Sequence, residues 1–435
     1  MRKTMCAIST QAAGNPDNRR DLVRVIVATS LVTGLEMFDF TVFGFFAVMI
    51  GDQFFPATDP MTSLLLAVGT FGVGFLMRPL GAMLIGTYAD RVGRRAAMMR
   101  TCWMMALGTA AVALCPPFAA IGIAAPLIVI AGRSLQGFAL GGDIGVAATF
   151  VMEAGSVSRR GFRISWQPTS QGAAALLGAS FGVLLSSTMP AVALASWGWR
   201  IPFIAGLLIA PAGLYVRHRL RENPAQAQAQ QPNSTPLAEL FRDHGATIVL
   251  AILMMAGQTI PVYALVYYMP SYVTRVMHMP TLTGFLAAAS SAVLLVVIPQ
   301  LSGRLADRMP RRKPLVVVSS ACTALLVYPA FLMITHATGP LPVILGACLV
   351  SASVALGAGI VSLLLLEALP AQVRATGAAI SHALSVALFG STAQFIVTGL
   401  IKWTGNPMSA AWYVAPACLV SFCAVLLFKE KARGA

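Results

Sequence analysis

The sequence predicts an all-α membrane protein with twelve transmembrane helices, and three observations carry this prediction. Of the 435 residues, 57% are hydrophobic and only 10% are charged, with a mean hydropathy of +0.77, whereas soluble domains hold about 25% charged residues. The chain contains a series of separate apolar runs of about 20 residues, which is the length that a helix needs to cross a bilayer. Long runs such as Leu349–Leu366 do not alternate between polar and apolar residues, so a transmembrane β-barrel is excluded.

Short polar or Gly/Pro-containing connections separate the apolar runs. The residues before the first run are polar and lack the apolar core and cleavage site of a signal peptide, so we expect the first span to stay as an anchor. The predicted spans are residues 22–50, 62–86, 97–116, 120–152, 164–190, 199–216, 246–273, 281–303, 314–335, 341–366, 373–402 and 410–428.

Basic residues are distributed unevenly between the two sides of the predicted membrane. Most of the 30 Lys and Arg residues fall in the two termini, in the 2–3, 4–5 and 8–9 loops and in the central loop. Only Arg200, Arg275 and Lys402 fall on the far side, and Arg78 and Arg133 lie within spans. The positive-inside rule therefore places both termini in the cytoplasm. This distribution also accounts for the net charge of +15 without a nucleic-acid partner.

The seven cysteines occur singly, without CxxC spacing. Neither a metal site nor a disulfide framework is indicated. We therefore expect no cofactor.

Two segments with the same pattern indicate an internal duplication. One follows the second predicted span and the other follows the eighth, and a similarly spaced Glu/Arg pair follows the fourth and tenth spans. In each of these repeats, the two copies are separated by about half the chain, as expected for a transporter built from two halves. The segments are Gly86-Thr-Tyr-Ala-Asp90-Arg91-Val-Gly93-Arg94-Arg95 and Gly303-Arg-Leu-Ala-Asp307-Arg308-Met-Pro310-Arg311-Arg312, and the pairs are Glu153 with Arg160 and Glu367 with Arg374.

This duplication predicts three parts. Residues 1–216 would form an N-terminal six-helix bundle and residues 246–435 a C-terminal one. Residues 217–245, which are polar and rich in Gln, Ala and Pro, would form a flexible cytoplasmic linker too short for a catalytic module.

The motif after the second span resembles the signature of the major facilitator superfamily, and the resemblance covers essentially the whole chain. The stretch from Arg133 to Gln171, including Arg-Ser-Leu-Gln-Gly-Phe-Ala-Leu-Gly-Gly-Asp-Ile-Gly, is similar to the metabolite:proton symporters. The segments around Glu36, Ser165 and Trp197 most resemble the citrate and tricarballylate carriers of that group. Two positions depart from the family pattern: Asp143 stands where Glu is usual, and Pro310 replaces a Gly.

The resemblance implies two pseudo-symmetric six-helix bundles that rock about a central site, with a conformational latch in the repeated cytoplasmic motifs. Ion pairs there would hold the cytoplasmic side shut and break when the halves move. Alternatively, these basic loops serve only to orient the protein. The implied latch residues are Gly86, Asp90, Arg91, Arg94, Glu153, Arg160, Asp307, Arg308, Glu367 and Arg374.

Three ionisable residues lie deep within predicted spans. Glu36 and Asp39 are three residues apart and share a helix face, and Arg133 falls at a similar depth in the fourth span. An unpaired charge there costs about 2.5 to 3.5 kcal/mol on insertion scales. We expect one carboxylate to hold the transported proton while Arg133 alternates between that carboxylate and an anionic substrate. The alternative is a permanent ion pair that fixes the first span to the fourth.

Other polar residues within spans are weaker candidates. Asp143 could relay a proton or pair with Arg78, which would act in gating or bind the substrate. Each remaining candidate could instead make ordinary bonds between helices. The candidates for substrate binding, with Arg133 and Arg78, are Gln136, Gln167, Gln171, Tyr263, Tyr267 and His382.

The direction of transport and the substrate class follow from what the spans contain. The fifth span lacks the Gly-Pro pair that is usual in drug/proton exchangers, which favours import by symport. Arg133, Arg78 and His382 favour an organic acid such as citrate or tricarballylate. We expect protons as the coupling ion and a monomer whose partners are this small organic anion and the lipid bilayer. A 2-oxoglutarate-like dicarboxylate, an aromatic acid, a compatible solute such as betaine or proline, and a non-transporting receptor remain as alternatives. An enzyme is not expected, since no nucleophile and base, metal cluster or phosphate loop appears.

Overall fold

A computed structural model of the protein describes residues 19–92, 94–142, 157–207, 237–370 and 373–430. All regular structure in these ranges is helical, which confirms the predicted fold class. Eight of the described helices are long and apolar enough to cross a membrane, and a bent pair adds a ninth. The sixth predicted span is described only as far as Leu207, and residues 143–152 of the fourth lie outside the described residues.

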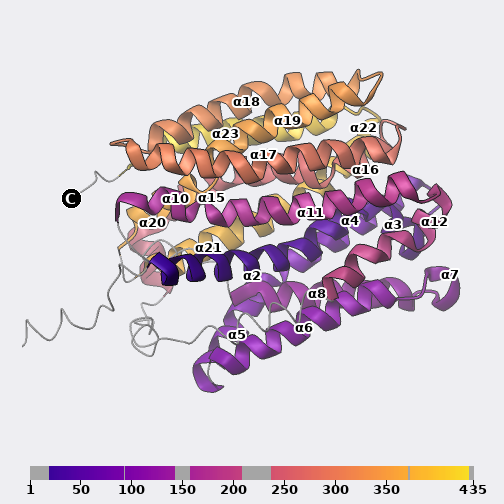
Figure 1. Ribbon diagram of the computed structural model, residues 1–435, viewed down its shortest axis with the longest axis horizontal. Coiled ribbons are helices and arrows are strands. Elements are labelled where there is room, and N and C mark those ends of the chain that lie inside the picture. The colour runs from indigo at the N-terminus through magenta and orange to yellow at the C-terminus, as the bar shows by residue number, and fades with distance from the viewer. Residues whose placement is uncertain (1–18, 93, 143–156, 208–236, 371–372, 431–435) are drawn as a thin grey trace, which may run out of the picture.

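The helices of the first half of the chain correspond to the first five predicted spans, with short helices between them (Figure 1). Their bounds are α2 (Arg19–Phe45), α3 (Ala47–Phe54), α4 (Pro60–Leu76), α5 (Arg78–Val92), α6 (Arg94–Leu114), α7 (Phe118–Ile121), α8 (Ala124–Ala139), α10 (Arg160–Ile164), α11 (Trp166–Thr188) and α12 (Ala191–Ser196).

The second half supplies the last six spans, and two of them contain a π-helical turn. Their bounds are α15 (Leu237–Val262), η4 (Tyr263–Tyr267), α16 (Met269–Arg275), α17 (Thr281–Arg308), α18 (Lys313–Thr335), α19 (Pro340–Gly357), α20 (Ile360–Ala368), α21 (Arg374–Ser385), η5 (Val386–Gly390), α22 (Ser391–Thr404) and α23 (Ser409–Leu427).

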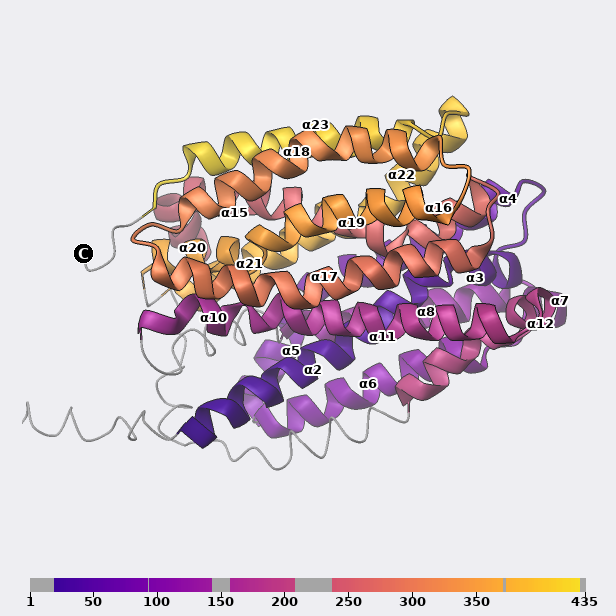
Figure 2. The same ribbon diagram turned by 45° about the horizontal axis from the view of Figure 1, so that its top comes forward.

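Two helix pairs join the halves. Helix α11 packs along α17, and α4 packs along α22; both views show α11 lying beside α17 (Figures 1 and 2). Small residues allow this approach: a Cβ added at Gly161 would lie 2.6 Å from the Gly303 carbonyl oxygen, and one added at Gly303 would lie 2.7 Å from the Gly161 carbonyl oxygen. The two pairings are equivalent under exchange of the halves, because the second and eighth spans correspond, as do the fifth and eleventh.

Several spans are broken where the sequence predicted continuous helices. The first span bends by 66° between α2 and α3. The tenth breaks before α20 at Gly359, whose φ of +80° is a conformation that glycine adopts without strain. In the seventh span, the Tyr268 N–H bonds to the Tyr263 carbonyl at 3.1 Å, five residues back. Pro270 has no N–H to donate to the preceding turn, which disfavours a regular α-helix there.

Two ends of the bundle are named below. The tail end is where α17 ends, α18 begins and residue 430 lies, at the left in Figure 1; the far end is where α3, α12 and α16 lie, at the right. In the orientation predicted from the basic residues, the tail end is cytoplasmic.

Candidate functional site

A buried network joins α2, α6 and α8 at the centre of the first half. Arg133 is fully buried, and its Nη1 lies 3.5 Å from Asp39 Oδ2. The same Nη1 donates to Gln136 Oε1 at 2.7 Å. The Gln136 Nε2 donates to Asp39 Oδ2 and, at 2.9 Å, to Thr109 Oγ1. Gln136 therefore connects the carboxylate and the guanidinium, and Thr109 is a member of the network that the sequence analysis missed.

Aromatic rings surround the Arg133 guanidinium. Its Cζ lies 4.1 Å from the Phe40 ring centroid, 4.4 Å from Phe43 and 5.8 Å from Phe71. Such ring contacts stabilise a desolvated cation by about 2 kcal/mol. Nε and Nη2 of Arg133 and Oδ1 of Asp39 have no hydrogen-bond partner among the described residues. The Arg133–Asp39 pair therefore keeps two donor nitrogens and one acceptor oxygen without hydrogen bonds in the described structure, and these atoms are available to other ligands.

A second guanidinium lies beside the first. Arg78 begins α5 and is 2% exposed. Its Cζ lies 4.1 Å from the Phe75 ring centroid and 5.1 Å from Phe40, so Arg78 and Arg133 share the Phe40 ring. None of the three Arg78 side-chain nitrogens has a hydrogen-bond acceptor within the described part of the chain. Buried charges are normally paired, so this group marks a place where an anion fits.

Two more predicted residues lie within electrostatic range of Arg78. These are Glu36, three residues before Asp39 on α2, and His382 on α21. Glu36 has a side-chain interaction of its own. The sequence predicted that Glu36 and Asp39 share one face of the first span. In the structure, Asp39 pairs with Arg133, and Glu36 lies within electrostatic range of Arg78.

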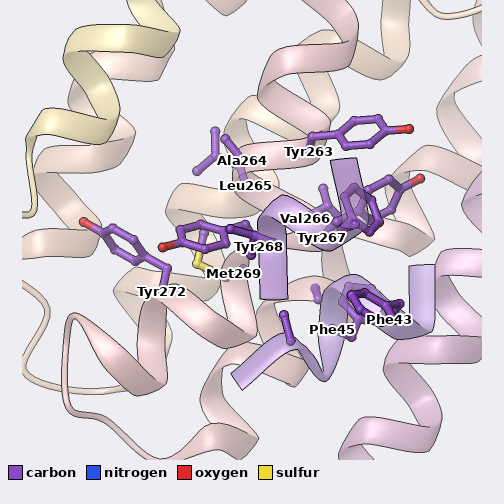
Figure 3. Close-up of a cluster of buried hydrophobic side chains, with 14 of the residues drawn as sticks. Phe43, Phe45, Tyr263, Ala264, Leu265, Val266, Tyr267, Tyr268, Met269 and Tyr272 are labelled. Atoms are coloured by element: carbon purple, nitrogen blue, oxygen red, sulfur yellow. The ribbon is translucent and has the colours of Figure 1, made fainter. Parts of the chain in front are cut away.

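The second half contributes aromatic side chains to this centre. Tyr263 and Tyr267 project to one side of the seventh span, and Tyr268 and Tyr272 project to the other (Figure 3). The Tyr263 ring lies 6.0 Å from Phe71 and 5.8 Å from Phe75. Tyr263 therefore contacts two of the rings that surround the arginines, and the Tyr267 ring packs against Tyr263 at 5.0 Å.

The other predicted binding residues are less central. Gln167 and Gln171 are partly buried on α11, and neither side chain bonds to the Arg133 network among the described residues. Asp143 lies outside the described residues. Gln394 on α22 was not predicted, although it is fully buried between the two halves. A single Gln in an apolar run was its only sequence signal.

At the tail end, the second copy of the repeated motif connects the halves. Asp307 accepts hydrogen bonds from the backbone N–H groups of Gly161 and Phe162, at 2.7 and 2.9 Å. This carboxylate therefore caps the start of the fifth span, where a helix favours negative charge.

Three further charges complete this contact. Arg312 pairs with Glu367 and lies 3.8 Å from Asp307. Arg160 Nη1 lies 3.6 Å from Glu367 Oε1. Arg308, which the motif pointed to, is exposed at the surface, and Arg312 occupies the buried position instead.

The first copy of the motif is described only in its backbone. Gly86, Asp90 and Arg91 lie in α5 and Arg94 begins α6, but their side chains lie outside the described structure. Glu153 also lies outside it. Arg374 begins α21, next to the undescribed residues 371–372.

At the far end, two ion pairs that the sequence analysis missed connect the halves. Arg275 pairs with Asp52, and Lys402 Nζ lies 3.0 Å from Asp59 Oδ2. Hydrogen bonds from Thr62, from Lys402 and from the backbone N–H of Met61 lower the pKa of Asp59 to about 2. Polar contacts between the halves are thus present at both ends of the bundle.

Comparisons with known proteins place this geometry in a family. The model of the Major Facilitator Superfamily matches residues 29–393. A citrate-proton symporter of Klebsiella pneumoniae is 33% identical over 393 residues, which are 90% of this chain and 88% of the relative. The alpha-ketoglutarate permease of Escherichia coli (strain K12) is 32% identical over 423 residues, 96% of each chain.

A solved structure shows the same fold at low sequence identity. The partially occluded inward open conformation of the xylose transporter XylE from E. coli superposes with a TM-score of 0.77 at 16% identity, covering 95% of this chain and 99% of that one. The likeness confirms the predicted arrangement of twelve helices in two bundles. This chain belongs to the major facilitator superfamily and, within it, to the metabolite–proton symporters.

Proposed function

We propose that this protein imports a tricarboxylate, such as citrate or tricarballylate, together with protons across the bacterial cytoplasmic membrane. The observation that carries the proposal is the pair of buried guanidinium groups on one aromatic ring. Arg78 has no hydrogen-bond acceptor and Arg133 has two free nitrogens within the described structure. Guanidinium groups bind carboxylates bidentately, and two of them suit an acid with at least two carboxylates.

Asp39 is the proposed proton carrier. Its Oδ1 is buried without a hydrogen-bond partner in the described residues, whereas Oδ2 accepts from Gln136 and faces Arg133. A proton on Oδ1 removes the negative charge and leaves the bonds at Oδ2 in place. Arg133 then loses its counter-charge and binds an anionic substrate instead.

Gln136 holds the resting pair together in this scheme. Its amide oxygen can only accept, so it faces Arg133, and its amide nitrogen can only donate, so it faces Asp39. We assign Gln136 to positioning as well as to substrate binding. Tyr263, Tyr267 and His382 would complete the site from the second half, and Gln167 and Gln171 would reach the substrate only after the halves move.

Proton coupling supplies the energy for uptake. Moving one negative charge into a cytoplasm at −100 mV costs about 2.3 kcal/mol, so an anion with several charges needs protons to enter. Opening of the far end would admit substrate and protons, and opening of the tail end would release them. Protons leave Asp39 on the alkaline side, and Arg133 returns to it.

Relatives support this substrate class. Two proteins named citrate-proton symporter, from Klebsiella pneumoniae and Salmonella typhi, are both 33% identical to this chain. A dicarboxylate such as 2-oxoglutarate is the second candidate, because two guanidinium groups also match two carboxylates and a relative is named for that acid.

Uptake into proteoliposomes tests the proposal. With an inward proton gradient, labelled citrate should accumulate above its external concentration, and a proton ionophore should abolish accumulation. Asp39→Asn should abolish gradient-driven accumulation while retaining exchange of internal for external citrate. Arg133→Ala should abolish both, with the protein still monodisperse in detergent. Accumulation that is indifferent to the gradient, or normal transport by Arg133→Ala, would contradict the proposal.

A further inference from the structure

Gln394 is a buried polar side chain at the place where the two halves meet. It lies on α22, directly after the π-helical turn η5, and is 0% exposed. Its Nε2 lies 3.5 Å from the carbonyl oxygen of Tyr263 in the other π-helical turn, η4. A Cβ added at Gly44 of α2 would meet this nitrogen at 3.4 Å and a Phe71 ring carbon at 3.6 Å.

The side-chain oxygen of Gln394 has no hydrogen-bond donor among the described residues. The orientation of the amide follows from chemistry, because a backbone carbonyl only accepts and must face the amide nitrogen. The free atom is therefore the carbonyl oxygen Oε1. Leaving a buried acceptor without a donor destabilises a fold, so an unpaired acceptor here points to a donor that is present only in part of the transport cycle.

The position of Gln394 connects it to the proposed substrate site. The Phe71 ring beside Gly44 lies 5.8 Å from Arg133 Cζ and 6.0 Å from the Tyr263 ring. The first half thus offers two cations in contact with this aromatic cluster, and the second half offers a neutral acceptor whose amide lies close to the same Phe71 ring. A ligand that binds the two arginines lies near Gln394 as well.

We infer that Gln394 Oε1 accepts a hydrogen bond from a hydroxyl group of the transported acid, so that the protein prefers hydroxy acids to their deoxy analogues. This inference rests on the proposed function and sharpens its substrate class. An amide oxygen repels a carboxylate but accepts from a hydroxyl group. A site built to bond a substrate hydroxyl discriminates strongly against the analogue that lacks it, because the buried acceptor is then left unpaired.

Citrate and tricarballylate provide the test, since they carry the same three carboxylates and differ by one hydroxyl group. Uptake of each acid is measured in proteoliposomes with an inward proton gradient. The unaltered protein should prefer citrate by about 10- to 100-fold in the ratio of initial rate to half-saturating concentration. Gln394→Leu should remove this preference by lowering citrate uptake while tricarballylate uptake stays within about twofold.

Gln258→Leu is the matched control. Gln258 also has an unpartnered, buried Nε2, but it lies beside Ser319 and Gly357 within the second half. This variant should keep the preference for citrate. Should Gln394→Leu fail to fold, Gln394→Met replaces it as a variant of similar length without hydrogen bonds.

The outcomes separate the inference from the proposed function. Equal uptake of the two acids by the unaltered protein, or an unchanged preference in Gln394→Leu and Gln394→Met, would overturn the role of Gln394 and leave tricarboxylate transport intact. Parallel loss of both acids in the Gln394 variants would also overturn it, since that result indicates a structural role. If the unaltered protein takes up neither acid, the proposed function itself fails.

Discussion

The tail end and the far end of the bundle are both closed by contacts between the halves, but the contacts differ in kind. At the tail end, the Arg312 side chain is 1% exposed and that of Asp307 is 10% exposed, and Asp307 also caps a helix. At the far end, Lys402 and Asp59 are 40% and 44% exposed. Charge-assisted bonds to backbone in a buried setting contribute about 1.5 to 3 kcal/mol, whereas exposed ion pairs contribute little because solvent screens them.

This difference indicates which end opens more readily. The Lys402–Asp59 pair is exposed to solvent and screened by salt, and the Arg275–Asp52 pair is partly exposed, with side chains 21% and 49% exposed, so both pairs separate at low cost. At the tail end, Arg312 is buried and Asp307 is 10% exposed, and Arg312 and Arg160 share Glu367 as a partner. In the predicted orientation, the protein without substrate would favour the state that is open to the outside, which is the state an importer needs in order to load.

The largest effect should come from blocking the close approach at the tail end. Gly303→Ala places a Cβ within 2.7 Å of the Gly161 carbonyl oxygen, and a backbone atom cannot move aside cheaply. The tail end can then close only with strain, and uptake should fall by about 10- to 100-fold, because strain in a packed contact costs about 1 to 3 kcal/mol. Gly399→Ala on α22 is the control, since its nearest neighbour would be a Leu65 side-chain atom at 3.9 Å. Near-normal uptake by Gly303→Ala would show that this contact is not needed for transport.

Removing the charge of Asp307 should have the next largest effect. Asp307→Asn keeps the shape but weakens the cap on Gly161 and Phe162, and the population with a closed tail end should fall about 10-fold. A cysteine introduced at Thr169, which faces α17 through its bond to the Val296 carbonyl, should then react faster with a thiol reagent in a variant without other cysteines. Arg308→Gln changes a neighbouring exposed charge and should leave the labelling rate unaltered. Equal rates in both variants would contradict the strength assigned to this end.

The far-end ion pair should have a smaller effect. Asp59→Lys or Lys402→Asp alone should change uptake by no more than about threefold. The double exchange Asp59→Lys with Lys402→Asp should restore part of the loss, because the opposite charges face one another again. Raising the salt concentration should reduce the difference between the single variants and the unaltered protein. A loss as large as that of Asp307→Asn would remove the contrast between the ends.

The smallest expected effect is that of pH on the same pair. A carboxylate with a lowered pKa contributes stability above its unfolded value of about 3.9, and this contribution is lost as the pH falls through the folded value. Because the pKa of Asp59 is about 2, its charge should not change between about pH 5 and 8. The ratio of uptake by Asp59→Asn to uptake by the unaltered protein should therefore stay constant over that range, and a slope in the ratio would contradict the assignment.

The sequence predicted the fold class well because span length and charge placement are local properties. The depth of Asp39 and Arg133 along their helices, counted from the sequence, also sufficed to predict that their side chains can meet. The partners that connect the halves were harder to predict. Motif position pointed to Arg308, but only packing decides that Arg312 turns inward, and no local pattern links Asp59 to Lys402 or Gln394 to Tyr263.

The π-helical turn η4 carries a mechanical consequence for the seventh span. A π-turn holds one residue more than an α-turn, and an α-helix advances by about 100° for each residue. If the surplus residue passed along the helix to a neighbouring turn, every side chain in between would rotate by about that angle. Each residue passed would exchange one backbone hydrogen bond for another, so the helix would stay bonded throughout. Tyr263 and Tyr267, which stand inside this turn, could thus exchange an aromatic contact for an open path without any helix unfolding.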